Sequence, residues 1–274
     1  MTAGDVAAGL HLCRASGWNQ LAGDWQVFLD WNPPRCRVAE RDGKVIGTVA
    51  SLRYGECFSW LSMVLVDPQE RGSGVGTRLL QEGLDMLGED CARLDATALG
   101  RPIYARSGFI DEYPITRMMT NVDASAFTGA KSTRLMKAED LPAVLSYDRV
   151  VFGADRGRLL LRLFEVAPAY AWIAEGASNL QGFCLGRPGF LYQQIGPLVA
   201  HDDRIAQDLL AACLHSQGGK KFAVDIPEFR PEWLSWLTAR GFSTARSFVR
   251  MRRGDNTCLG QPERMYAIVG PEFG

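Results

Sequence analysis

One stretch constrains the fold of this chain more than any other, and it runs from Met63 to Leu80. Its first residues, Met-Val-Leu-Val, form an apolar run that is typical of a buried strand, and Asp67-Pro68 ends that run. Glycines then stand at positions 72, 74 and 76, and apolar residues recur at helical spacing as far as Leu87. The stretch therefore predicts a strand, a glycine-rich loop and a helix, in that order.

The predicted loop lies at a helix N-terminus, where an anion is readily bound. Glycine lets the backbone approach a ligand closely, and the first N–H groups of a helix have no partner within it. The spacing excludes two common nucleotide motifs, because no lysine precedes Thr77 and the glycines do not fit G-x-G-x-x-G. A plain strand-to-helix turn is the alternative for the loop taken alone. The pattern favours a phosphate ligand held by main-chain groups.

A second segment makes the pattern more specific. The loop reads Arg-x-x-G-x-G from Arg71 to Gly76 after a strand that ends in Val-Asp-Pro, and residues 94–109 carry a strand, a short helix with Tyr104, and Gly108-Phe109. In this order, the two segments resemble the GNAT superfamily of N-acyltransferases. The resemblance implies acetyl-CoA as cosubstrate, held at Val64, Leu65, Val66, Arg71, Gly72, Ser73, Gly74, Val75, Gly76 and Thr77.

The length of 274 residues suggests two domains, and the two halves echo one another. Val66-Asp67-Pro68 is matched by Ile195-Gly196-Pro197, and Ala105 to Phe109 is matched by Thr238 to Phe242. Such repetition predicts a duplicated fold. We expect an α/β (α+β) protein with two tandem GNAT-like domains, each a mixed, mostly antiparallel sheet flanked by helices. Their expected bounds are residues 1–125 and 134–274, with a small-residue linker at 126–133.

The second half lacks the glycine loop. Where the loop would follow Pro197-Leu198-Val199, the chain carries Asp202 and Asp203, and these carboxylates would repel a phosphate. We therefore expect acetyl-CoA at the first domain only. The whole arrangement resembles bacterial tandem-GNAT acetyltransferases with a degenerate C-terminal domain.

Composition excludes several classes of protein. With 47% hydrophobic and 22% charged residues and a net charge of −1, the chain is typical of a soluble globular protein and lacks the basic balance of a nucleic-acid binder. Seven scattered cysteines without a C-x-x-C pair predict reduced thiols, and three unpaired histidines predict no metal site. Without an export signal or an apolar run of ~20 residues, we expect no membrane contact and a cytoplasmic monomer or homodimer.

The GNAT resemblance also assigns catalytic groups. It implies that Tyr104 protonates the departing CoA thiolate, with packing under the donor as the alternative, and that the main chain of residues 64–66 pairs with pantetheine. Thr97 and Arg101 could contact CoA. The general base stays unassigned, because no carboxylate occurs from Phe58 to Val66. Other carboxylates are candidates, each with a structural alternative. For Glu56 the alternative is a solvated turn residue, and for Asp24 it is a surface charge or a helix cap. For Asp148, Asp155 and Asp225 it is an ordinary salt-bridge partner.

The acceptor site is expected between the halves. By resemblance, its wall would include Trp18, Asn19, Asp24 and Trp25, and the second half could add Asp148, Arg156 and Arg187. Either arginine would hold an acid group of the acceptor if it faced the cleft, with interdomain ion pairs as the alternative. We expect acetyl transfer to a primary amine, favouring a small molecule. A protein N-terminal or lysine acetyltransferase and a non-catalytic acyl-CoA sensor are the alternatives.

Overall fold

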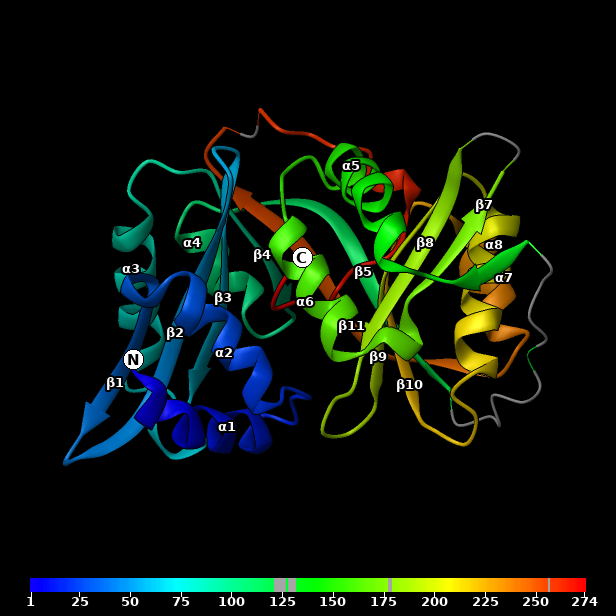
Figure 1. Cartoon of the computed structure of the whole chain (residues 1–274). Helices are drawn as coiled ribbons and strands as arrows, with labels where there is room; N and C mark the ends of the chain where they lie inside the picture. The colour runs from blue at the N-terminus through cyan, green and yellow to red at the C-terminus, as the bar shows by residue number, and fades with distance from the viewer. Residues whose placement is uncertain (121–126, 128–131, 177–178, 256) are drawn as a thin grey trace.

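The computed structural model describes residues 1–120, 127, 132–176, 179–255 and 257–274 (Figure 1). Of the predicted linker, residues 126 and 128–131 lie outside these described residues. The first half comprises α1 (Val6–Ala15), α2 (Ala22–Trp31), β1 (Cys36–Arg41), β2 (Lys44–Tyr54), β3 (Phe58–Val66), α3 (Val75–Leu87), β4 (Ala92–Thr97), α4 (Arg101–Arg106) and β5 (Ile110–Thr120).

The second half repeats this order of helices and strands. It comprises β6 (Thr133–Leu135), α5 (Leu141–Phe152), α6 (Gly157–Val166), β7 (Trp172–Glu175), β8 (Leu180–Arg187), β9 (Gln193–Ala200), α7 (Asp203–His215), β10 (Phe222–Pro227), α8 (Pro231–Thr238), β11 (Phe242–Arg253) and β12 (Met265–Ala267). The predicted α/β architecture, a mostly antiparallel sheet flanked by helices, is confirmed.

The strands of the described residues form one twelve-stranded sheet rather than two separate ones. Its order is β1-β2-β3-β4-β11-β5-β10-β9-β8-β7-β6, with β12 paired to β9. Strand β11, from the end of the second half, lies between β4 and β5, while β5 pairs with β10 (Figure 1). Strands β5 and β11 have therefore exchanged places between the halves. The division at 126–133 describes the order of the chain, and the sheet runs through both parts.

Each exchanged strand is fixed to its new neighbour by an arginine–aspartate pair. On β11, Arg250 donates to both carboxylate oxygens of Asp95 on β4, at 2.8 and 2.9 Å. On β5, Arg117 donates to both oxygens of Asp225 on β10, at 2.6 and 2.7 Å. Both aspartate side chains are fully buried. Two corresponding ion pairs thus hold the two halves together.

A hydrophobic core crosses the boundary between the halves. Trp25 and Phe28 of α2 pack in the same cluster as Phe152 of α5 and Phe273 near the end of the chain. The rings of Phe28 and Phe273 are stacked with centroids 5.4 Å apart. Because apolar side chains from both halves share this cluster, burial as well as the exchanged strands opposes their separation.

The cysteine prediction is wrong at two positions. Cys57, in the turn between β2 and β3, forms a disulfide with Cys258, which lies beyond β11. The two residues are 201 positions apart in the chain, and their Cα atoms are 5.7 Å apart. Their spacing gave no indication of the pairing, because strand exchange brings the two segments together. Cys13, Cys36, Cys91, Cys184 and Cys213 are free and buried.

Candidate active site

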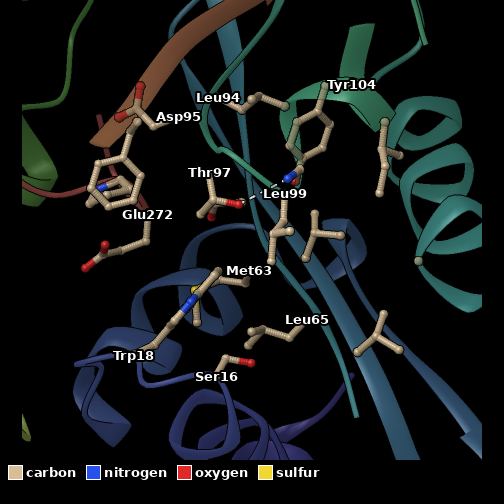
Figure 2. Close-up of a pocket in the computed structure, with 18 of the residues that line it drawn as sticks. Ser16, Trp18, Met63, Leu65, Leu94, Asp95, Thr97, Leu99, Tyr104 and Glu272 are labelled. Carbon is tan, nitrogen blue, oxygen red and sulfur yellow. Dashed lines mark hydrogen bonds between the residues drawn. The ribbon is translucent and has the colours of Figure 1, made fainter. Parts of the chain in front are cut away.

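A cavity of about 940 Å³ lies beside β3 and β4, and residues from both halves line it (Figure 2). It exists because these parallel strands diverge. Pairing between β3 and β4 is confined to Ser59 with Ala92 and Trp60 with Arg93. Beyond Trp60, the two strands no longer bond to each other, and the cavity occupies the space between them. Val64, Leu65 and Val66 follow along its wall.

An irregularity in β3 turns its main chain toward this space. Met63 has a left-handed backbone with φ 54°, an uncommon conformation for a residue other than glycine. The register of β2 against β3 shifts beside it, and the Thr48 hydroxyl donates to the Met63 carbonyl at 2.7 Å. Such a bulge redirects the residues that follow it. The sequence gave no sign of it.

The glycine loop adopts the predicted strand–loop–helix arrangement, and Gly74 is the N-cap of α3. Gly72 and Gly74 have φ values of 81° and 88°, which favour glycine. A Cβ atom at either position would meet nothing within 4 Å, so the space above the loop is open to a ligand. The loop residues that line the cavity are Arg71, Gly72, Gly74, Gly76 and Thr77. Ser73 instead donates to the Glu70 carbonyl, and the Val75 side chain joins the core beneath the loop.

Tyr104 lines the cavity from α4, above Thr97 in Figure 2. Its ring packs edge-on against Phe109, with centroids 5.9 Å apart. A Cβ atom on Gly100 would lie 2.8 Å from the tyrosine ring, so any larger residue there would displace the ring. Burial raises the pKa of Tyr104 to about 12. The phenol therefore stays protonated at neutral pH. Arg101 is directed away from the cavity, into an exposed pair with Asp111.

Trp18 and Asn19 also line the cavity, and Figure 2 shows Trp18 on the side of the view away from Tyr104. The Asn19 side chain accepts from the N–H groups of Leu191 and Tyr192, at 2.7 and 3.1 Å, and donates to the Tyr192 carbonyl at 3.0 Å. The loop after α1 is thereby bonded to the second half. Asp24 and Trp25 lie elsewhere: the Asp24 carboxylate accepts from the Leu21 N–H at 2.7 Å, and the Trp25 ring is fully buried.

The second-half residues predicted at the acceptor site do not line the cavity themselves. Arg156 and Asp148 form a buried two-bond ion pair, and Arg156 also donates to the Gly274 carbonyl at 2.6 Å. Arg187 donates to Glu272, which does line the cavity, and its Nη1 atom lies 3.4 Å from Asp24. These residues hold the end of the chain in place. Of these pairs, Arg187 with Asp24 joins the two halves, as the alternative of interdomain ion pairs expects, whereas Arg156–Asp148 and Arg187–Glu272 lie within the second half.

The remaining candidate carboxylates also have other partners. Glu56 pairs with Arg53 on the surface, and Asp155 accepts from the Gly157 N–H at 2.8 Å. Asp225 is bound by Arg117. The exposed Glu56 and the ion pair of Asp225 agree with the structural alternatives that the sequence left open, whereas the Asp155 contact is with a main-chain N–H group.

Sequence reasoning missed the cavity residues that strand exchange supplies. Arg246 and Phe248 come from β11, Arg117 comes from β5, and Pro271 and Glu272 come from the segment after β12. Asp95 lines the cavity as well. In the repeat, Leu94-Asp95-Ala96-Thr97 corresponds to Val224-Asp225-Ile226-Pro227, which indicates the duplication but not the exchange of strands. Glu272 follows a Gly-Pro pair and carries no comparable signal.

Two carboxylates line the cavity among the described residues, and they differ in their contacts. Both oxygens of Asp95 accept from Arg250, while Arg187 donates to Oε1 of Glu272. Burial raises the pKa of both carboxyl groups, and the neighbouring arginine opposes that rise in each case. Figure 2 shows Glu272 and Tyr104 on opposite sides of this view, with Thr97 between them.

The helix that corresponds to α3 in the second half begins differently. The Asp202 carboxylate caps α7 by accepting from the Ile205 N–H at 3.0 Å. Asp203 accepts from Arg230 at 3.0 Å and from the Tyr266 hydroxyl at 2.6 Å. A carboxylate of the chain itself thus occupies the position that a phosphate takes at such a helix end.

Across the described part of the chain, none of the helices combines the length and apolar character needed to cross a bilayer. Within the same residues, no three His, Cys, Asp or Glu side chains gather in a way that could hold a metal ion.

Comparisons with known proteins agree with the repeated architecture. Residues 10–109 match the model of the acetyltransferase (GNAT) family, and residues 144–267 match that of an acetyltransferase (GNAT) domain. A holothin acyltransferase from Pseudoalteromonas sp. (strain SANK 73390) is 22% identical over 263 residues, covering 95% of this chain and 88% of the relative.

Solved structures share the fold over the whole length. A putative acetyltransferase from Pyrococcus horikoshii superposes with a TM-score of 0.83 at 22% identity, covering 100% of this chain and 94% of the other. A tandem GNAT protein from the clavulanic acid biosynthesis pathway gives 0.65 at 15% identity, covering 92% and 96%. The two family matches together span most of the sequence. The chain belongs to the GNAT superfamily, in its tandem form with two GNAT domains, and it is an acyl-CoA-dependent acyltransferase.

Proposed function

We propose that the protein transfers the acetyl group of acetyl-CoA to the primary amine of a small molecule. The first domain, residues 1–125, holds the donor, and the second, residues 134–274, completes the acceptor site. The observation that carries this proposal is the single cavity that joins the glycine loop and Tyr104 to side chains from the second half.

The donor site uses mainly backbone groups. The pyrophosphate binds over Gly72 and Gly74, where the open space and the free N–H groups of the first turn of α3 meet. Pantetheine runs along residues 64–66, whose strand has separated from β4. The Val64–Val66 side chains serve the wall of the cavity, and their main chain binds the donor.

Tyr104 supplies the proton for the leaving group. Attack by the amine nitrogen on the thioester carbonyl carbon breaks the carbon–sulfur bond, and the thiolate takes the phenolic proton. A neutral tyrosine is required for this step, and the raised pKa of Tyr104 keeps it neutral. Its ring is already fixed by Phe109 and Gly100.

Enclosure by the second half favours a small acceptor. Trp18 of the first half and Phe248 of β11 give the cavity apolar surface, while Arg246 gives it a cation. Since these groups surround one space, they suit a small amine with an aromatic or other flat portion better than a protein chain. An acid or carbonyl group on that amine would accept hydrogen bonds from the Arg246 guanidinium.

A test of the function is thiol release from acetyl-CoA with a panel of small amines, peptides with free N-termini, lysine peptides and holothin. Turnover should be confined to small amines, and calorimetric titration should give one acetyl-CoA per chain because Asp202 caps α7. Turnover with peptides alone would indicate that the acceptor is a protein and not a small molecule. Binding of acetyl-CoA without turnover of any amine would instead indicate an acyl-CoA sensor.

A further inference from the structure

A proton acceptor is still required for the proposed reaction, and the cavity contains few groups that could serve. When the amine nitrogen bonds to the carbonyl carbon it must lose a proton, which a nearby carboxylate can accept. Among the described residues, the carboxylates that line the cavity are Asp95 and Glu272. The choice between them follows from their hydrogen bonds.

Asp95 is poorly suited to accept a proton. Arg250 donates to both of its oxygens, and the Arg250 side chain is also bonded to the Tyr113 hydroxyl at 2.8 Å. Protonation of Asp95 would leave a buried guanidinium without its counter-charge, which is costly. Its position opposite Arg250 in paired strands explains the residue without a catalytic role.

Glu272 has a different set of contacts. The hydrogen bond from Arg187 engages Oε1, whereas Arg250 donates to both oxygens of Asp95, and the Glu272 N–H group is a further donor to the Glu272 carboxylate. The side chain is 4% exposed, so the carboxylate is directed into the protein and the cavity more than into bulk water. It also lies on the side of the cavity away from Tyr104 in the view of Figure 2, as acceptor and donor of two different protons require.

The segment that carries Glu272 is fixed to the first domain on both sides of the residue. Trp60 of β3 donates to the Pro271 carbonyl at 3.0 Å, and the Tyr54 hydroxyl of β2 donates to the Phe273 carbonyl at 2.7 Å. Arg156 donates to the next carbonyl, that of Gly274. These three side chains bind the main-chain carbonyls of Pro271, Phe273 and Gly274, so the carboxylate between them is held against the donor domain although it is distant in the sequence.

We propose that Glu272 is the catalytic proton acceptor and that Arg187 positions it. The inference rests on the proposed function. As the carbon–nitrogen bond forms and the carbon–sulfur bond breaks, the amine proton passes to the Glu272 carboxylate, and the CoA thiolate takes the proton of Tyr104. Both groups then return to their starting states by exchange with solvent, so protons balance over the cycle.

The charges around Glu272 set the pH at which it works. Arg187 on β8 and Arg117 on β5 favour its ionised form, while Asp24 on α2 and burial oppose it. Tyr54 on β2, Cys13 on α1 and Tyr192 also face it. Removal of the Arg187 charge therefore raises the pKa of Glu272, and the ionised carboxylate is then reached only at higher pH.

The test is the pH dependence of kcat/KM in the full-length protein with its best amine acceptor. Glu272→Gln should lower kcat/KM by about 10²- to 10⁴-fold and remove one acidic limb of the profile. Glu263→Gln, an exposed glutamate on the same C-terminal segment, is the matched control and should leave both unchanged. The profile is measured with two acceptor amines of different pKa. The limb set by ionisation of the amine shifts between them, whereas the limb set by the enzyme carboxylate stays at the same pH.

A second pair of variants tests Glu272 without altering it. Arg187→Met should move the enzyme's acidic limb to higher pH, whereas Arg187→Lys, which keeps the charge, should move it less. A structural role alone would lower activity equally at every pH. If Glu272→Gln does not fold, as judged by thermal melting with acetyl-CoA, the Arg187 pair decides the inference alone.

The possible outcomes distinguish failure of the Glu272 inference from failure of the proposed function. In one outcome, the native protein acetylates an amine while the acidic limb of Arg187→Met stays in place or Glu272→Gln keeps near-native activity. Either result would reject Glu272 as the proton acceptor and leave the proposed function standing. A native protein that binds acetyl-CoA but acetylates nothing overturns the function, and Glu272 as proton acceptor with it.

Discussion

Arg250 of β11 and Asp95 of β4 are directly opposed in paired strands and joined by two hydrogen bonds, with less than 2% of either side chain exposed. One residue comes from each half of the chain. Arg117 and Asp225 repeat the relationship on β5 and β10. Because each pair fixes a strand that has crossed into the other half, neither half is complete without the other.

Asp95→Asn should lower the free energy of unfolding by about 3–5 kcal/mol, because the Arg250 charge stays buried without its carboxylate. Urea denaturation at neutral pH measures the change. The matched control is Asp111→Asn, which breaks the exposed pair with Arg101 and should cost less than about 1 kcal/mol.

The unfolding of Asp95→Asn also reports on the exchange. Both halves should unfold in one transition, as shared strands require, and intrinsic fluorescence and circular dichroism should give the same midpoint. Two separate unfolding transitions, or equal losses of unfolding free energy in Asp95→Asn and Asp111→Asn, would contradict the conclusion that the exchanged strands hold the two halves together.

The features that sequence predicted well are local ones. The strand from Phe58, the glycine loop and the helix that follows depend on neighbouring residues, on apolar spacing and on the conformational freedom of glycine. The repeated order of elements was visible for the same reason. Gly100 could not be interpreted, although its role is simple once the Tyr104 ring is seen to lie against it.

What the sequence could not predict depends on contacts between distant segments. The exchange of β5 and β11 needs the same local patterns as two separate sheets would, so periodicity cannot distinguish the two arrangements. The exchange places Arg246 and Phe248 of β11 at a cavity that is also lined by residues from 15 to 104, and Glu272 reaches the same cavity from the segment after β12. The Cys57–Cys258 disulfide follows from the same rearrangement.

Gly74→Glu should weaken acetyl-CoA binding strongly without unfolding the protein. The side chain would enter the open space above the loop and place a carboxylate where the pyrophosphate is expected. Gly43→Glu is the matched control, because Gly43 also has a positive φ, 74°, with nothing within 4 Å of its Cβ position, and it lies at the turn between β1 and β2.

Both glycine variants should lose similar stability through backbone strain, on the order of 1–2 kcal/mol. The dissociation constant for acetyl-CoA, measured by titration calorimetry, should rise at least about 100-fold in Gly74→Glu alone, the loss of a charge-assisted interaction of roughly 3 kcal/mol. Equal affinities of the two variants for acetyl-CoA would show that the pyrophosphate does not bind at this loop.

Tyr104→Phe should lower kcat about 10²-fold or more while leaving the acetyl-CoA dissociation constant unchanged, because the phenyl ring keeps the contacts with Phe109 and Gly100 and only the proton donor is lost. The pH dependence of activity gives a second test of Tyr104. Tyr104 acts while protonated, and its pKa is raised to about 12, so the native enzyme should keep its activity through the range in which an ordinary tyrosine, with a pKa of about 10, would ionise.

Tyr147→Phe, on α5 and outside the cavity, controls for the loss of a hydroxyl group. A native basic limb near the ordinary tyrosine value, or a Tyr104→Phe enzyme with native kcat, would assign thiolate protonation to another group. A rise in the acetyl-CoA dissociation constant with unchanged kcat would instead reduce Tyr104 to a packing residue under the donor. Thiol release measured at saturating amine, together with the binding titration, distinguishes these results because one reports the chemical step and the other the donor complex.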